Sequence, residues 1–93
     1  MTELDRCHLV IAPAARRQLA DTLPEAVAFA AYEFIVGPLL DNPQRVGKPV
    51  HEPLHDRHSA RRGTYRIIYR IDEHARTVTV LAIMPRADAY RAP

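Results

Sequence analysis

The sequence has a single cysteine and no uninterrupted hydrophobic run long enough to cross a bilayer. With Cys7 alone, the chain can form neither an internal disulfide nor a multi-cysteine zinc site. The longest apolar run, residues 26–40, is interrupted by Glu33 and by Gly37-Pro38, and it is too short to cross a bilayer. No signal segment follows the charged N-terminus. We therefore expect a cytoplasmic protein that does not associate with a membrane.

The chain does contain enough material for one domain, and its charge is unevenly distributed. Its 93 residues, 47% of them hydrophobic, predict a single globular domain over residues 1–93. Residues 1–43 carry three arginines and six acids, whereas residues 44–93 carry nine arginines, one lysine and five acids. Arginine suits paired hydrogen bonds to phosphate. The basic half indicates a face for an anionic partner, with nucleic acid as the leading candidate and a merely solvated surface as the alternative.

The first half of the chain is predicted to form a strand and two helices. Residues 7–12 are mostly apolar and end at a proline, which predicts a short strand. Residues 13–20 follow as a helix with that proline in its first turn, where a missing N–H costs nothing. A second helix is predicted over about residues 23–40. Its surface is so widely apolar that it is either deeply buried or partly covered by another chain.

The predicted second helix has recognisable start and stop signals. Thr22 and Glu25 have the spacing of a capping box, in which each side chain bonds the other residue's backbone. Asp41-Asn42-Pro43 is expected to end the helix.

The second half predicts strands joined by turns. Residues 44–58 form a polar connector, expected to be irregular and to include at most one short strand. A strand then ends near residue 62 in a tight turn, where Gly63 supplies the positive φ angle. Residues 65–71 alternate as a strand, residues 72–76 form a hairpin loop, and residues 77–84 form a strand apolar enough to lie inside the sheet.

These elements predict an α+β fold, with two helices packed on one face of a small antiparallel sheet and a short C-terminal tail. Alternation along residues 65–71 assigns the two faces. Tyr65, Ile67, Tyr69 and Ile71 should face the helices, while Arg66, Ile68 and Arg70 face away. The outer face would therefore be free for a ligand.

Several segments, in this order and spacing, resemble the RelE/ParE toxin superfamily, and specifically its RelE-like mRNA-cutting members from actinobacteria. They are Ala15-Arg16-Arg17-Gln18-Leu19, residues 34–40, residues 45–49, residues 59–72 and Arg86-Ala87-Asp88-Ala89-Tyr90. The resemblance extends over nearly the whole chain.

This resemblance implies the toxin of a type II toxin–antitoxin pair with the RelE-like fold. It implies an endoribonuclease that needs neither metal nor cofactor, enters the ribosomal A site and cleaves mRNA there. A cognate antitoxin would wrap the toxin and block its site, and operator DNA would be bound only through the antitoxin.

The resemblance also assigns site residues. Arg66 is expected to contact the scissile phosphate, with a surface ion pair to Asp72 or Glu73 as the alternative. Since strand alternation brings only one of Arg61 and Arg62 to the same face, Arg61 is favoured. The expected catalytic residues are Arg66, Arg61, Arg86 and Tyr90, and the expected RNA-binding residues are Lys48, Arg57, Arg62 and Arg70.

One departure from the family pattern concerns proton transfer. Many relatives carry a histidine or an additional basic residue just before the position of Arg86, where this chain has Met84-Pro85. Either Tyr90, His58 or His55 then moves the protons, or this member of the family cleaves slowly. His51, His55 and His58 could also suggest a metal site, but Pro53 and the lack of a convincing helix argue against it.

Two other functions stay open at the level of the sequence. The ParE-like branch shares the fold and poisons DNA gyrase. An inactive homologue that retains only antitoxin and operator association is also compatible with Met84-Pro85.

Overall fold

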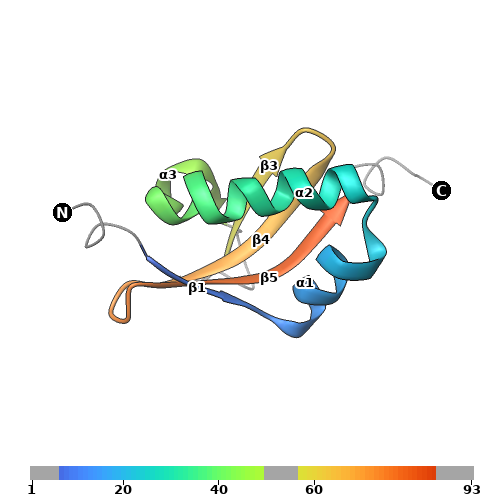
Figure 1. Ribbon diagram of the computed structural model, residues 1–93. Helices are drawn as coiled ribbons and strands as arrows, with labels where there is room; N and C mark the ends of the chain where they lie inside the picture. The colour runs from blue at the N-terminus through green and yellow to red at the C-terminus, as the bar shows by residue number, and fades with distance from the viewer. Residues whose placement is uncertain (1–6, 50–56, 86–93) are drawn as a thin grey trace.

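The computed structural model describes residues 7–49 and 57–85, and in these ranges five strands form one mixed sheet (Figure 1). The strand order is β1-β5-β4-β3-β2. The bounds are β1 His8–Ile11, β2 Lys48–Pro49, β3 Arg57–Arg62, β4 Tyr65–Asp72 and β5 Thr77–Pro85. Strands β2 to β5 pair antiparallel, as predicted, whereas β1 joins β5 in parallel. Because β5 has a neighbour on each side, its prediction as an interior strand is confirmed.

The two predicted helices are present, and each continues from α-helical into wider π-helical turns. Pro38 lies inside the second π-helical segment. Proline has no N–H to bond the carbonyl four residues earlier, and the wider turns allow the helix to continue through this position. Among the described residues, no helix combines the length and apolarity needed to cross a membrane. The helical segments are α1 Pro13–Arg17, η2 Gln18–Thr22, α2 Glu25–Phe34, η3 Ile35–Leu39 and α3 Pro43–Val46.

Two details of the predicted helical region are wrong. The capping box does not form: Thr22 ends η2, and Pro24 precedes α2 without a side-chain cap hydrogen bond. The reason lies at Leu23, whose backbone is extended and whose side chain is buried. Its N–H donates to the Gln18 carbonyl, so the first helix ends there before the next one begins. The connector also begins with the short helix α3, where irregular backbone was expected. Its predicted short strand is β2.

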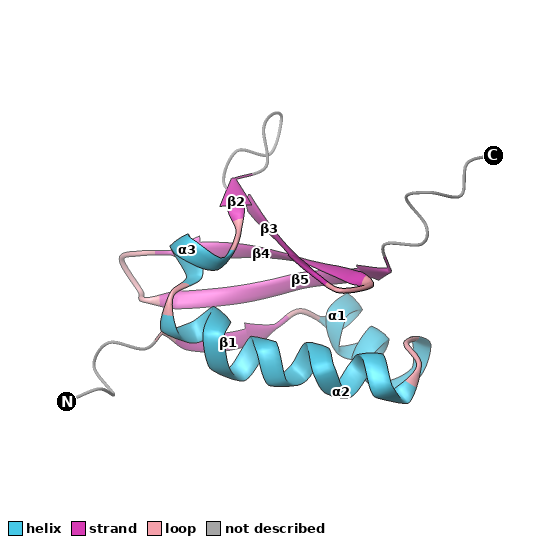
Figure 2. Cartoon of the chain, turned by 90° about the horizontal axis from the view of Figure 1, so that it is seen from above, coloured by secondary structure: helices cyan, strands magenta, loops and turns pink. Residues whose placement is uncertain are grey.

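The core lies between the helices and one face of the sheet, and Figure 2 shows α1 and α2 together on that side. Alternation along β4 matches the prediction, since Tyr65, Ile67 and Tyr69 are buried while Arg70 is exposed. The pairing of β4 with β5 shifts register between Ile68 and Tyr69. The largest fully buried side chains are Tyr69, Ile35, Leu39, Ile67, Ile83, Val78 and Val80.

Candidate functional site

The face of the sheet that the helices leave open carries most of the predicted basic residues. In the antiparallel pairing of β3 with β4, Arg61 lies directly opposite Arg66, and Arg57 lies opposite Arg70. Lys48 of β2 lies opposite Ser59 of β3, whose side chain is on the same face as Arg61. Strand register therefore gathers on one surface cations from three segments.

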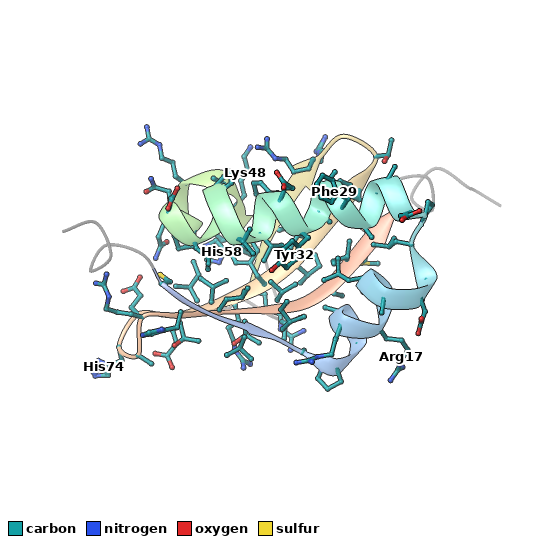
Figure 3. The ribbon with its side chains drawn as sticks, in the orientation of Figure 1. Arg17, Phe29, Tyr32, Lys48, His58 and His74 are labelled. Carbon is teal, nitrogen blue, oxygen red and sulfur yellow. The ribbon has the colours of Figure 1, made fainter. Side chains whose placement is uncertain are left out.

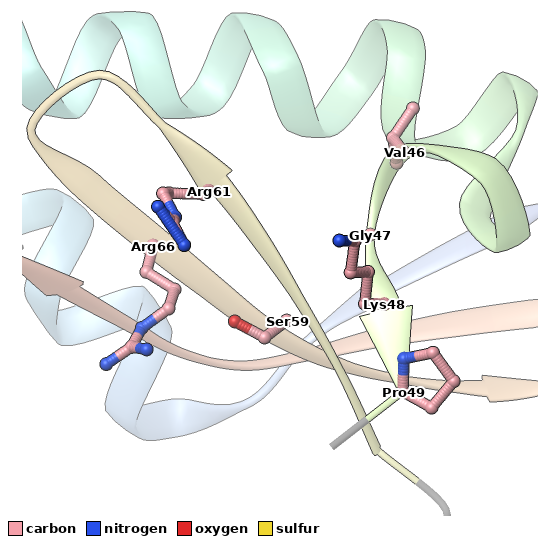
Figure 4. Close-up of a pocket in the computed structure, with 7 residues that line it drawn as sticks. All are labelled: Val46, Gly47, Lys48, Pro49, Ser59, Arg61 and Arg66. Atoms are coloured by element: carbon pink, nitrogen blue, oxygen red, sulfur yellow. The ribbon is translucent and has the colours of Figure 1, made fainter. Parts of the chain in front are cut away.

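Part of this surface is hollowed into a pocket of about 550 Å³ (Figure 4). Three cations and one hydroxyl group line it: Lys48, Arg61, Arg66 and Ser59. Val46, Gly47 and Pro49 complete the wall. Sequence reasoning did not single out Ser59, and only its register opposite Lys48 reveals that it belongs to the pocket.

Arg66 is held in the pocket without the acidic partner that the sequence left as an alternative. Its Nε is buried and has no hydrogen-bond partner among the residues that the structure describes. Asp72 instead accepts the backbone N–H groups of His74 and Ala75, and Glu73 accepts from the Gln44 amide. Since a buried unpaired donor is costly, the Arg66 site favours an incoming acceptor such as a phosphate oxygen.

Lys48 is positioned by a buried tyrosine beneath it. The Tyr69 hydroxyl donates to the Pro43 carbonyl at 2.6 Å, which fastens α3 to the sheet. Gly47 then passes so close that an added Cβ would lie 2.9 Å from the Ser59 carbonyl and closer still to the Tyr69 hydroxyl. Burial raises the pKa of Tyr69 to about 12, so the hydroxyl stays protonated and keeps donating at neutral pH. The sequence marked Tyr69 only as a core residue.

Two predicted residues lie instead on the face that packs against the helices. The Arg62 guanidinium lies 4.4 Å from the centre of the Phe34 ring, so it is not brought to the pocket. His58 stacks on Tyr69 with 5.5 Å between ring centres, and burial lowers its pKa. The imidazole therefore lies on the helix side of the sheet, away from the pocket, so the geometry does not favour His58 among the alternatives for proton transfer.

The remaining predicted residues either lie on the open face of the sheet or fall outside the residues that the structure describes. Arg57 and Arg70 share the face with the pocket but do not line it. Arg86, Tyr90, His51 and His55 lie outside the described residues. Within residues 7–49 and 57–85, no three His, Cys, Asp or Glu side chains gather into a potential metal site.

The pocket is suited chemically to a phosphodiester. Each of the two arginines offers a planar set of donors that matches phosphate oxygens. Lys48 adds a third charge from the opposite wall. Such fixed donors stabilise negative charge that develops on phosphorus during reaction.

Comparisons with known proteins identify relatives of this chain. Residues 9–90 match the family described as the ParE toxin of type II toxin–antitoxin systems, parDE. The chain is 46% identical over 84 residues to Toxin RelE of Mycobacterium tuberculosis, covering 90% of this chain and 86% of that protein. It is 49% identical over 77 residues to Toxin RelG of the same organism, covering 83% and 87%. The toxin–antitoxin complex RelBE2 from M. tuberculosis contains a chain that matches with a TM-score of 0.83 and 42% identity, covering 87% of this chain and 99% of that one.

Proposed function

Because the chain belongs to the family of ParE toxins of type II toxin–antitoxin systems and lies among its RelE-like members, we propose that it is a ribosome-dependent endoribonuclease. It cleaves mRNA in the ribosomal A site without a metal ion, and so stops translation and growth in the cytoplasm. The observation that carries the proposal is the pocket in which Lys48, Arg61 and Arg66 converge.

The proposed reaction needs no more than this surface and two proton transfers. The ribose 2′-oxygen attacks the neighbouring phosphorus and loses its proton to a base. The bond from phosphorus to the 5′-oxygen then breaks, and a proton reaches that oxygen, which leaves a 2′,3′-cyclic phosphate and a 5′-hydroxyl. Arg61 and Arg66 hold the non-bridging oxygens of the phosphorane, whose extra negative charge they stabilise.

Two further residues enter the proposal through the family pattern alone. Arg86 would steady the departing 5′-oxygen or the adjacent phosphate. Tyr90 would stack on a base or take part in proton transfer, as aromatic side chains often stack on single-stranded RNA. With His58 facing the core, Tyr90 and His55 are the groups left from the predicted set for moving protons.

The proposed partner is a cognate antitoxin, as in the RelBE2 complex of the M. tuberculosis relative. The helix α2 leaves Phe29 65% and Tyr32 49% exposed, and because the two residues are three positions apart, their rings are neighbours on the helix surface. A mostly helical partner could cover this apolar helix surface and extend over the basic face, while operator DNA would be contacted by the antitoxin.

The test is to add the purified protein to ribosomes stalled on a defined mRNA and to map the new RNA 5′ ends. Naked mRNA and the Arg66→Ala variant are the controls for ribosome dependence and for the pocket. Arg17→Ala removes the same charge from an exposed helix position and controls for net charge. Cleavage within the A-site codon should fall by a factor of about 10²–10³ in Arg66→Ala and stay unchanged in Arg17→Ala.

Two results would contradict the proposal. Intact mRNA from a protein that still arrests growth would point to the ParE-like activity, which a DNA gyrase supercoiling assay measures. Intact mRNA from a protein that binds its antitoxin and arrests nothing would identify an inactive homologue.

A further inference from the structure

The sheet has two edge strands, and only one of them carries residues that discourage pairing with a further strand. β2 consists of Lys48 and Pro49, and lysine and proline are common on edges because they block additional pairing. β1 lies at the opposite edge (Figure 1), and its sequence, His8-Leu9-Val10-Ile11, contains no acid, arginine, lysine or proline. The Val10 side chain is 48% exposed. The β1 edge is therefore the one suited to receiving a further strand.

The backbone of β1 has hydrogen-bonding groups that β5 does not use. The N–H groups of His8 and Ala12 donate to carbonyls of β5 at 2.8 and 2.9 Å. Because backbone groups of successive strand residues point to opposite sides, Leu9 and Ile11 direct their N–H and C=O groups away from β5. No strand lies on that side within the part of the chain that the structure describes. The side chains of Leu9 and Ile11 pack against the core, which holds this edge in place.

The two outward-facing residues are spaced so that a second copy of β1 can pair with both. In an antiparallel ladder, the two residues of a hydrogen-bonded pair exchange both N–H···O bonds, and the next such pair lies two residues along. When two β1 strands run antiparallel about a twofold axis at Val10, Leu9 of each copy pairs with Ile11 of the other. Every outward donor then meets an acceptor. The two Val10 residues form the central non-hydrogen-bonded pair, in which side chains approach most closely.

The charges at the two ends of β1 complement each other in the same arrangement. Just beyond its C-terminal end, α1 exposes Arg16 and Arg17. At its N-terminal end, the N–H of Cys7 donates to the carbonyl of the residue before Asp41, and the adjacent turn, residues 72–76, contains two acids and one arginine. Antiparallel pairing places the basic end of one copy beside the acidic end of the other, and the twofold axis repeats this contact.

We propose that the protein associates with a second copy of itself through β1, so that the two sheets join into one continuous sheet. Antiparallel pairing of edges keeps the helices of both copies on one side of this sheet. The pocket, which is lined by β2, β3 and β4, lies towards the other edge and stays uncovered. The inference therefore goes beyond the proposed nuclease activity and does not depend on it. Because the strand is short, the interface is small, and the dimer dissociation constant should be on the order of 100 µM.

The first test is sedimentation velocity of the full chain over a concentration range of about 1 to 500 µM, which should show monomer giving way to dimer. Val10→Lys should stay monomeric throughout, because it places like charges directly opposite each other across the twofold axis. Val10→Thr is the matched control, since it keeps a neutral β-branched side chain, and it should dimerise. Thermal unfolding of the dilute proteins checks that both variants fold, as expected at a half-exposed position.

A second test identifies the surface without any substitution. Amide hydrogen exchange, resolved by residue with NMR, should show Leu9 and Ile11 exchanging faster than His8 in dilute protein, since only His8 donates to β5. As the concentration rises, the N–H groups of Leu9 and Ile11 should become protected several-fold. Val10→Lys should show no such dependence on concentration.

Three results would overturn the inference. The first is a monomer over the whole concentration range. The second is a dimer in which exchange at Leu9 and Ile11 does not change, which would place the contact elsewhere, such as on the exposed rings of α2. The third is protection of these N–H groups by the antitoxin but not by concentration, which would make the edge a site for a partner strand. None of these measurements involves RNA, so failure of the proposed function leaves them unaffected.

Discussion

Gly47 has no side chain, and the space that a methyl group would need is occupied by the Tyr69 hydroxyl and the Ser59 carbonyl. Its backbone has an extended φ of −135°, which any residue can adopt, so close approach is what requires glycine here. Single residues of this kind fix the position of Lys48, the next residue along the chain, although Tyr69 does not line the pocket and Gly47 lines it with backbone atoms alone.

Gly47→Ala is expected to destabilise the protein by about 1–3 kcal/mol, because the methyl group overpacks a buried contact. It should also lower the cleavage rate, since β2 and Lys48 must move. Gly37→Ala is the matched control, because a Cβ there meets nothing within 4 Å and the residue is helical. Urea unfolding should show a loss for Gly47→Ala and no loss for Gly37→Ala. Equal stability of the two variants would refute the packing argument.

The buried Tyr69 hydroxyl should make stability fall at alkaline pH. Its pKa is about 12 in the folded protein and near 10 in the unfolded chain, so its contribution is complete below pH 10 and is lost as the pH rises towards 12. The loss attributable to Tyr69 is roughly 2–3 kcal/mol. Tyr69→Phe should be less stable at pH 7 by about 1 kcal/mol, the hydrogen bond to Pro43, and should lose less between pH 10 and 12. Parallel pH profiles for the two proteins would contradict this assignment.

At the scale of elements, alternation along β3 separates two neighbouring arginines into different roles. Arg61 lines the pocket on the open face, while Arg62 packs over Phe34 on the helix face. Burial raises the pKa of Tyr65, which lies opposite Arg62 in the strand pair, and the positive charge of Arg62 acts against this rise. The two residues are chemically identical, so only the pleat of the strand distinguishes them.

Arg62→Ala is expected to cost about 0.5–1 kcal/mol of stability through the lost cation–π contact and to leave cleavage unchanged. Arg61→Ala should show the opposite pattern, with cleavage reduced by a factor on the order of 10² and stability retained. Thermal unfolding and the ribosome assay, performed on both variants, measure the four quantities. A fall in cleavage for Arg62→Ala as large as that for Arg61→Ala would refute the assignment of faces.

The elements that local pattern determines were predictable, and those that depend on distant contacts were not. Period-two alternation gave the faces of β4, and the glycine in the β3–β4 turn has the expected positive φ of 56°. The parallel pairing of β1 with β5 joins residues almost seventy positions apart, for which the sequence carries no local signal. The capping box failed because tertiary burial of Leu23 overrode a local preference. Within the candidate site, the family resemblance pointed to Arg66 and alternation favoured Arg61, whereas Ser59 and the support from Tyr69 required the register of β2 and β3.

At the scale of the whole molecule, the two layers carry different surfaces. The sheet presents the cationic face and the pocket. The helix α2 presents the exposed rings of Phe29 and Tyr32 (Figure 3), and Glu33 on the same helix is also exposed. The helix layer lies on the opposite side of the sheet from the open face. Binding of RNA and the helix-side part of antitoxin binding should therefore be separable by mutation.

Phe29→Ser is expected to weaken antitoxin binding and to leave ribosomal cleavage unchanged, since Phe29 is exposed and lies in the layer away from the pocket. Loss of a well-packed aromatic anchor at an interface commonly costs 2 kcal/mol or more, about a thirtyfold fall in affinity. Arg66→Ala should show the reverse, with cleavage lost and antitoxin binding retained. Titration calorimetry with the purified antitoxin and the ribosome assay measure both effects for each variant. If Phe29→Ser bound the antitoxin as tightly as the wild type, the partner would have to dock on another surface, and the exposed rings of α2 would need a different explanation.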